Sequence, residues 1–267
     1  MDYKAIFFDI DGTLLDSEHK MLPSTKQVID SLQKNNIKFA IVTARGPFGV
    51  RPLFKKYGFV CPMICYSGAL IIDEYNNILK SEGMSAEVTT KVISYIESCR
   101  INCTWNIYAE EMWIVNHIND RRIRTEEEII DAKSAEGSVS ILEKSVPVGK
   151  IWCMFDSNNL DEIICGIKQR FSDLSICRVD ATSIEIMANG VTKGSGVRYL
   201  CDKWRITTDK TIAFGDHYND EQMLRTVGLP FIMGNAPADL KERFLNITKS
   251  NDDDGIYYGL RTIGLDF

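Results

Sequence analysis

A short apolar run, Ala5-Ile6-Phe7-Phe8, ends directly in two acidic residues, in the stretch Asp9-Ile10-Asp11-Gly12-Thr13. An apolar run closed by Asp and Gly is typical of a buried strand of a parallel sheet followed by a turn. In open α/β sheets, ligands bind at the carboxyl ends of such strands. The pattern therefore predicts a parallel α/β sheet with two carboxylates at its ligand-binding edge.

Two other interpretations of this acidic turn have to be weighed. A plain polar turn has the same composition, and only partners elsewhere in the chain can decide against it. A calcium-binding loop needs Gly at its sixth position and Glu at its twelfth, whereas Gly12 is fourth and Lys20 is twelfth here. The spacing excludes the calcium loop and leaves turn or active site.

The composition is that of an ordinary globular protein, with 267 residues of which 45% are hydrophobic and 25% charged, long enough for two domains. The net charge of -6 argues against binding to nucleic acid or to an anionic membrane. Charged residues interrupt any signal peptide, and no apolar stretch reaches the roughly 18 residues of a spanning helix. We expect a cytoplasmic protein with no membrane or nucleic-acid partner.

The eight cysteines are scattered along the chain, mostly within apolar segments, and form no Cys-x-x-Cys pair. Only His19, His117 and His217 could complete a zinc site. This pattern favours reduced thiols in the core over disulfides or zinc.

Strands and helices alternate in the first part of the chain. A helix with Ser24-x-x-Gln27 as a candidate capping box leads to a strand at 37–42. This strand delivers Thr43-Ala44-Arg45 to the same edge as Asp9 if the crossover is right-handed. Beyond a third strand, hairpins mixed with helices indicate an inserted α+β module with a mixed or antiparallel sheet at about 83–186.

The alternation resumes after the insert. Lys193 lies at the amino end of a helix, and a strand at 211–214 runs into a second acidic turn that begins with Gly215-Asp216. We therefore expect a Rossmann-like parallel-sheet core from residues 1–82 and 187–267, with the α+β module as a cap.

Polar side chains from four strand ends or helix starts should meet at one edge of this core: Asp9 with Asp11, Thr43, Lys193, and Asp216 with Asn219 and Asp220. Four carboxylates repel one another, and Lys193 alone cannot balance them, so we predict a bound cation. Ligands that are all oxygen favour Mg²⁺. A cation and a lysine beside carboxylates are what phosphoryl transfer needs.

These motifs resemble those of the haloacid dehalogenase superfamily of phosphatases, in particular its Cof-like, type IIB branch with a C2-type cap. The resemblance rests on Asp9-Ile10-Asp11-Gly12-Thr13 for the first motif, Thr43 for the second, Lys193 for the third, and Gly215-Asp216 through Asn219-Asp220 for the fourth. Two later stretches are also typical of that branch, Met233-Gly234-Asn235-Ala236 and Asn251-Asp252-Asp253-Asp254-Gly255. The resemblance covers essentially the whole chain.

The resemblance implies a role for each motif residue. Asp9 would attack phosphorus to form an aspartyl-phosphate, and Asp11 would protonate the leaving group and then activate water. Lys193 would offset charge on the phosphate and the nucleophile. Mg²⁺ would be held by Asp9, the main-chain carbonyl of Asp11, and Asp216.

The remaining site residues would bind the phosphate or orient its neighbours. The phosphate group would be held by Thr43, Ala44, Arg45 and Asn219, while Asp220 would orient Lys193 or a metal-bound water. Three positions depart from the family pattern: Ala44 where Gly is usual, Ser67 where Asn is common, and His217 where a small residue is often found. His217 fits either a solvent-facing loop or a contact with the leaving group.

We therefore expect a Mg²⁺-dependent phosphatase of small phosphorylated metabolites, in particular sugar phosphates. The alternatives are a phosphomutase of the same fold, which would need a bisphosphate activator, and a catalytically silent binding protein, against which the intact motifs count. The cap should determine the substrate, and Arg121, Arg122 and Arg124 there fit either an anionic group or a solvated helix face. Neither the physiological substrate nor the oligomeric state is predictable from the sequence.

Overall fold

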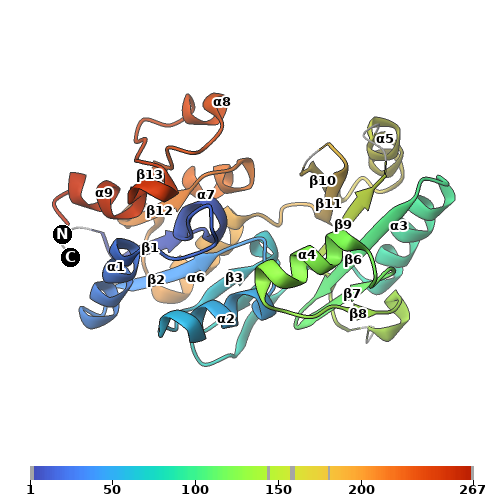
Figure 1. Ribbon diagram of the computed structural model, residues 1–267, viewed down its shortest axis with the longest axis horizontal. Helices are drawn as coiled ribbons and strands as arrows, with labels where there is room; N and C mark the ends of the chain where they lie inside the picture. The colour runs from blue at the N-terminus through green and yellow to red at the C-terminus, as the bar shows by residue number, and fades with distance from the viewer. Residues whose placement is uncertain (1–2, 143–144, 157–159, 180, 266–267) are drawn as a thin grey trace. The chain divides into compact units, whose positions relative to one another are not determined.

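The computed structural model describes residues 3–142, 145–156, 160–179 and 181–265. The chain divides into two compact units (Figure 1). The first, here called the core unit, comprises Met1–Arg45, Leu53–Leu79 and Thr192–Phe267. The second, the cap unit, comprises Gly46–Pro52 and Lys80–Val191. The short segment Gly46–Pro52 lies within the range expected for the core, 1–82, but groups with the cap unit.

The core unit is built on a sheet in the order β13-β12-β1-β2-β3-β4-β5. Its strands are β1 (Ala5–Phe8), β2 (Lys38–Val42), β3 (Met63–Cys65), β4 (Leu70–Ile72), β5 (Ile78–Ser81), β12 (Thr211–Gly215) and β13 (Leu229–Ile232). The pairs from β13 to β3 are parallel, and β4 runs antiparallel to β3. The predicted parallel α/β core is confirmed, with β1 at its centre.

Strand β1 is apolar throughout because both of its faces are buried. Phe7 stacks on Trp204 of a helix on one face, with ring centroids 5.8 Å apart. Phe8 points to the opposite face and stacks on Phe214 of the neighbouring strand at 5.7 Å. This double burial fixes the register of β1 and hence the position of Asp9 at its end.

The helices of the core unit connect its strands: α1 (Pro23–Lys34), α2 (Pro47–Tyr57, whose first turns belong to the cap unit), α6 (Lys193–Trp204), α7 (Glu221–Leu224), α8 (Ala238–Lys241) and α9 (Gly255–Thr262). The capping box predicted at Ser24 and Gln27 is wrong. Helix α1 begins at Pro23, whose missing N–H suits a first helical position, and Leu22 precedes it without a side-chain cap. The hydroxyl of Ser24 instead donates to the carboxylate of Asp254.

The cap unit contains a second sheet, in the order β10-β11-β9-β6-β7-β8. Its strands are β6 (Cys103–Ala109), β7 (Met112–Val115), β8 (Ala135–Glu136), β9 (Lys150–Phe155), β10 (Leu174–Arg178) and β11 (Ser183–Ala188). All pairs are antiparallel except β7 with β8. Helices α3 (Ala86–Ser98) and α5 (Asp161–Arg170) supply the apolar partners of one sheet face, and α4 (Arg121–Ile130) follows β7. The predicted α+β module with a mixed sheet is confirmed.

Two of the three arginines at the start of α4, Arg122 and Arg124, are engaged inside the cap unit. Arg122 donates to Asp120 at 2.6 Å and to the carbonyl of Phe155 at 3.2 Å. Arg124 donates to the buried carboxylate of Glu127 at 3.1 Å, and that carboxylate also accepts two bonds from Ser134. These contacts fasten the helix and the turn after it.

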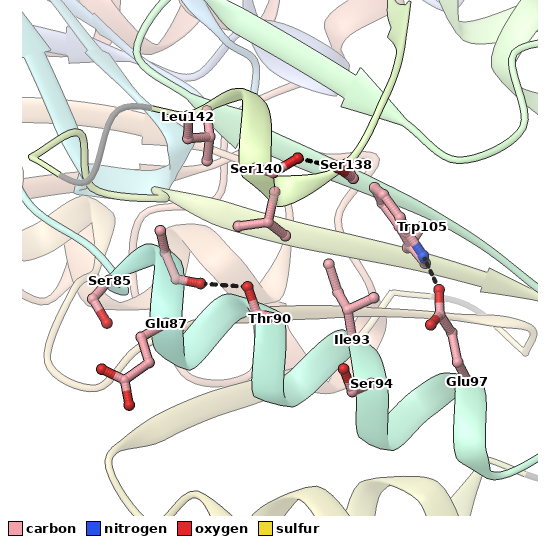
Figure 2. Close-up of a pocket in the computed structure, with 12 residues that line it drawn as sticks. Ser85, Glu87, Thr90, Ile93, Ser94, Glu97, Trp105, Ser138, Ser140 and Leu142 are labelled. Carbon is pink, nitrogen blue, oxygen red and sulfur yellow. Dashed lines mark hydrogen bonds between the residues drawn. The ribbon is translucent and has the colours of Figure 1, made fainter.

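A groove of about 810 Å³ runs between α3 and the turn at 138–142, and all its lining residues belong to the cap unit (Figure 2). Several polar groups along it are bonded to one another. The Trp105 indole donates to Glu97 at 3.1 Å, and the hydroxyls of Ser138 and Ser140 lie 2.6 Å apart. None of the predicted site residues lines this groove.

The cysteines are free thiols, most of them buried, with Cys165 and Cys177 exposed. None of the helices in the described part of the chain combines the length and the apolar character needed to cross a membrane.

Candidate active site

The turn after β1 presents Asp9 and Asp11 while burying the residue between them. Asp9 is extended, and residues Ile10–Leu14 form a single wide turn in which the backbone angles of Asp11 and Gly12 are not helical. Gly12 has φ +76°, and a Cβ atom there would lie 2.2 Å from the Asp216 carboxylate. Only glycine allows the acidic turn after β12 to approach this closely.

A buried lysine joins two of the acidic motifs. Lys193 Nζ donates to Asp9 Oδ1 and to Asp220 Oδ1, each at 2.6 Å. All three residues are at most 5% exposed. Burial alone would lower the pKa of Lys193, but the adjacent Asp220 and Asp9 carboxylates raise it above its ordinary value, so Lys193 is charged.

Lys193 is the first residue of α6, and the start of that helix is fixed by its own cap. The Thr192 hydroxyl accepts the N–H of Ser195 at 3.1 Å, and the Ser195 hydroxyl accepts the N–H of Thr192 at 3.0 Å. The loop after β3 lies against this helix start, since a Cβ on Gly68 would lie 2.2 Å from the Thr192 carbonyl oxygen. The cap therefore holds the lysine backbone in place.

The turn after β12 is folded by Asp220. Its Oδ2 accepts the main-chain N–H groups of Asp216 and His217, each at 3.0 Å. Asp216 in turn accepts the Thr13 hydroxyl at 2.8 Å. Burial and the nearby Asp220 carboxylate raise the pKa of Asp216 to about 7. Burial, Asp220 and Asp216 likewise raise the pKa of Asp9 well above its usual value, although Lys193 opposes this.

The acidic residues fit a cation. Within the described residues, carboxylate oxygens of Asp9, Asp216 and Asp220 lie within 4.8 Å of one another. Lys193 bonds two of these three carboxylates, Asp9 and Asp220, so with all three ionised the cluster would hold more negative than positive charge, which a bound cation would relieve. Because Asp220 already bonds Lys193 and two amides, Asp9 and Asp216 are the carboxylates best able to turn toward an ion.

The Asp11 carboxylate has a different partner from the cluster of Asp9, Asp216 and Asp220. Arg45 Nε donates to Asp11 Oδ2 at 2.7 Å and Arg45 Nη2 donates to Oδ1 at 2.5 Å, a two-point contact. The Arg45 side chain is buried, whereas that of Asp11 is 46% exposed. Arg45, which was predicted to bind the phosphate, therefore bonds the Asp11 carboxylate in this structure.

The loop after β2 is held by the loop after β3. Thr43 is buried, and its Oγ1 accepts the N–H of Arg45 at 3.1 Å. The N–H of Ser67 donates to the carbonyl of Thr43 at 2.9 Å, and that of Tyr66 to the carbonyl of Arg45 at 3.1 Å. Tyr66 and Ser67 both have positive φ angles, 49° and 51°. These contacts fix the backbone of Thr43-Ala44-Arg45.

Two polar atoms around the site are buried without a hydrogen-bond partner among the described residues. They are Ser67 Oγ and Asn219 Oδ1. Asn219 directly precedes Asp220 in the turn after β12. By contrast, His217 is exposed and packs edge-on against the ring of Tyr218.

The loops that support the site were recognised from the sequence only through the family resemblance. Asn235 Nδ2 donates to the carbonyl of Gly12 at 2.9 Å, and the N–H of Asn251 donates to Asn235 Oδ1 at 3.1 Å. Asn251 Nδ2 also donates to the buried carbonyl of Leu15 at 2.9 Å. The two late stretches thus brace both sides of the first acidic turn.

Comparison with known proteins connects this site to a family. The sequence profile of the haloacid dehalogenase-like hydrolase family matches residues 6–260. A Haemophilus influenzae protein named "Putative phosphatase" is 33% identical, and the match covers 96% of each chain.

Solved structures share the fold. A haloacid dehalogenase-like hydrolase from Bacteroides thetaiotaomicron superposes with a TM-score of 0.87 at 22% identity, over 98% of this chain and 99% of that one. A structure described as a subclass IIB sugar phosphatase superposes with a TM-score of 0.83 at 21% identity, over 98% and 99% of the two chains. At these identities the likeness supports the fold.

Proposed function

The chain belongs to the haloacid dehalogenase-like hydrolase family and is a phosphatase, and we propose that it hydrolyses small phosphorylated metabolites with Mg²⁺ through an aspartyl-phosphate on Asp9. The observation that carries the proposal is the buried contact of Lys193 with Asp9 and Asp220. It holds a carboxylate oxygen at the strand end beside a fixed positive charge. That is the arrangement a nucleophile needs when it approaches a phosphate dianion.

In the first step, a carboxylate oxygen of Asp9 forms a bond to phosphorus as the bond from phosphorus to the leaving oxygen breaks. Asp11 gives its proton to that oxygen, which departs as an alcohol. In the second step, water attacks phosphorus and gives a proton to Asp11. The acyl-phosphate bond breaks, which restores the Asp9 carboxylate and releases inorganic phosphate.

The phosphate oxygens would be bound by Thr43, the amide of Ala44, Asn219 and Lys193. The fixed backbone after β2 supports this assignment for Thr43 and Ala44. For Asn219, the side-chain Nδ2 group would be the donor to a phosphate oxygen. We assign Arg45 to the phosphate-binding residues as well. Its contact with Asp11 would connect these residues to the general acid. Asp220 keeps Lys193 aimed at Asp9.

Mg²⁺ would be held by the carboxylates of Asp9 and Asp216 and by the carbonyl of Asp11. When bound, it would neutralise charge on the nucleophile and the phosphate oxygens. Burial and the neighbouring carboxylates raise the pKa of Asp9 and of Asp216, and a bound cation would oppose both effects. Sugar phosphates are the proposed substrates, in line with the structural neighbour described as a sugar phosphatase.

The experiment compares wild-type protein with Asp9→Asn in turnover of p-nitrophenyl phosphate with Mg²⁺. We expect the variant to lose nearly all activity, and Asp202→Asn, an exposed position on α6, to keep it. Retention of most activity by Asp9→Asn would refute the nucleophile assignment. Release of inorganic phosphate from a panel of sugar phosphates, without isomer interconversion, distinguishes the phosphatase from a phosphomutase.

A further inference from the structure

His19 lies on a short loop between the first acidic turn and α1, and the backbone of that loop is closed on itself. The N–H of Asp16 donates to the carbonyl of Lys20 at 2.8 Å, and the N–H of His19 donates to the carbonyl of Asp16 at 3.0 Å. The Asp16 carboxylate also accepts the N–H groups of Glu18 and Lys20 at 2.9 and 2.8 Å. The loop is a compact, internally bonded unit.

The same loop is fastened to the rest of the core unit at both ends. The N–H of Ser17 donates to Asp252 at 2.8 Å, and the N–H of Met21 donates to the hydroxyl of Tyr57 at 2.9 Å. Asn251 holds the carbonyl of Leu15 just before it. A side chain carried by this loop therefore has a defined position.

The conformation of His19 directs its ring toward Asp11. His19 has φ +54°, a region that histidine, asparagine and aspartate enter more readily than most residues. Its Nδ1 lies 3.7 Å from Asp11 Oδ1. Both side chains are about half exposed, at 47% and 46%, whereas Arg45 contacts Asp11 from the buried side.

We infer that His19 is a positioning residue that holds the Asp11 carboxyl group in line with the leaving oxygen, an inference that rests on the proposed function. Arg45 restrains Asp11 from the protein interior, and His19 restrains it from the solvent side. Without His19, this half-exposed carboxyl group loses its contact on the solvent side and keeps the one with Arg45. Since proton transfer depends on a defined approach, the loss of that second contact would weaken general acid catalysis.

The inference makes a specific claim about substrates. Phenyl phosphate and p-nitrophenyl phosphate are similar in shape, but phenolate leaves poorly without a proton, whereas p-nitrophenolate is a stable anion. A residue that positions the general acid should matter for the first substrate and hardly for the second. A residue that only maintains the fold would affect both equally.

The experiment measures kcat/KM of wild-type, His19→Asn and Lys20→Asn proteins for both substrates with Mg²⁺. Asparagine tolerates the positive φ angle but cannot reach Asp11 as the imidazole does. We expect His19→Asn to lower kcat/KM about tenfold for phenyl phosphate and less than about twofold for p-nitrophenyl phosphate. Lys20→Asn, an exposed neighbour in the same loop, should leave both values unchanged.

An equal loss for the two substrates, no loss for either, or a rise in KM with an unchanged ratio would overturn the inference. Failure of the proposed function has a different signature, because wild-type protein would then turn over neither substrate, or Asp9→Asn would remain active. Thermal unfolding of His19→Asn is expected to match that of Lys20→Asn. A Tm that falls only in His19→Asn, together with an unchanged substrate ratio, would make His19 a structural residue.

Discussion

Replacing Lys193 with methionine removes the positive charge that bonds both Asp9 and Asp220. Both bonds are 2.6 Å long and buried, so methionine leaves carboxylates in the interior without their partner. Breaking a buried ion pair in this way costs about 3–5 kcal/mol of unfolding free energy. We expect Lys193→Met to lose this amount at pH 8 in the presence of a chelator, together with its phosphatase activity.

The pH dependence of the loss identifies its cause. Burial and Asp220 already raise the pKa of Asp9, and removal of the lysine raises it further. Above pH ~4 the native variant keeps a proton that the unfolded chain releases, so its unfolding free energy falls with rising pH, by at most about 1.4 kcal/mol per pH unit for each such proton. The difference from wild type should therefore be small at pH 5 and grow toward pH 8.

The assay is urea unfolding at pH 5, 6, 7 and 8, with Lys203→Met as the control. Lys203 is an exposed residue of the same helix, so its replacement tests the loss of a lysine without the buried pair. If Lys193→Met and Lys203→Met were equally stable at pH 8, or if the deficit of Lys193→Met did not change with pH, the electrostatic reasoning would be wrong.

Two further predictions concern the acidic turns. The pKa of Asp216 is raised to about 7, and a carboxylate must lose its proton to bind a cation. The Mg²⁺ affinity measured by calorimetry should therefore rise up to about tenfold from pH 6 to pH 7 and by a smaller factor from pH 7 to pH 8. Equal affinity at pH 6 and pH 8 would contradict this. Gly12→Ala adds a Cβ 2.2 Å from the Asp216 carboxylate, so kcat/KM should fall at least about tenfold. Gly58→Ala has a similar positive φ with open space around it and should lose about 1–2 kcal/mol of stability but no activity.

The elements that carry the catalytic motifs were predictable because their signals are local. The continuous apolar run of β1 reports burial on both faces, and the acidic residues follow it directly. Lys193 at the start of α6 and the acidic turn after the buried strand β12 are likewise indicated by residues next to them in the sequence. Parallel pairing then brings these strand ends to one edge of the sheet.

The supporting contacts were not predictable because they join distant parts of the chain through single hydrogen bonds. Asn235 reaches Gly12 and Asn251 reaches Leu15 across more than 200 positions, and nothing in either local sequence specifies the partner. The contact of Arg45 with Asp11 depends likewise on how two loops lie together. At α1 a local signal misled, since Pro23 fixed the first turn and left Ser24 free to bond Asp254.

The place of the cap in the chain has a consequence for how such enzymes change during evolution. For the longer of the two cap segments, the chain leaves the core unit after Leu79 and returns at Thr192. The hydroxyl of Tyr199 donates to the carbonyl of Leu79 at 2.7 Å, so exit and return are joined within the core. Closing an insertion of this size as a flexible loop costs only about 2 kcal/mol more than closing one of ten residues. An insertion with its own apolar core can therefore change or be exchanged as a module without altering the acidic turns of the core unit.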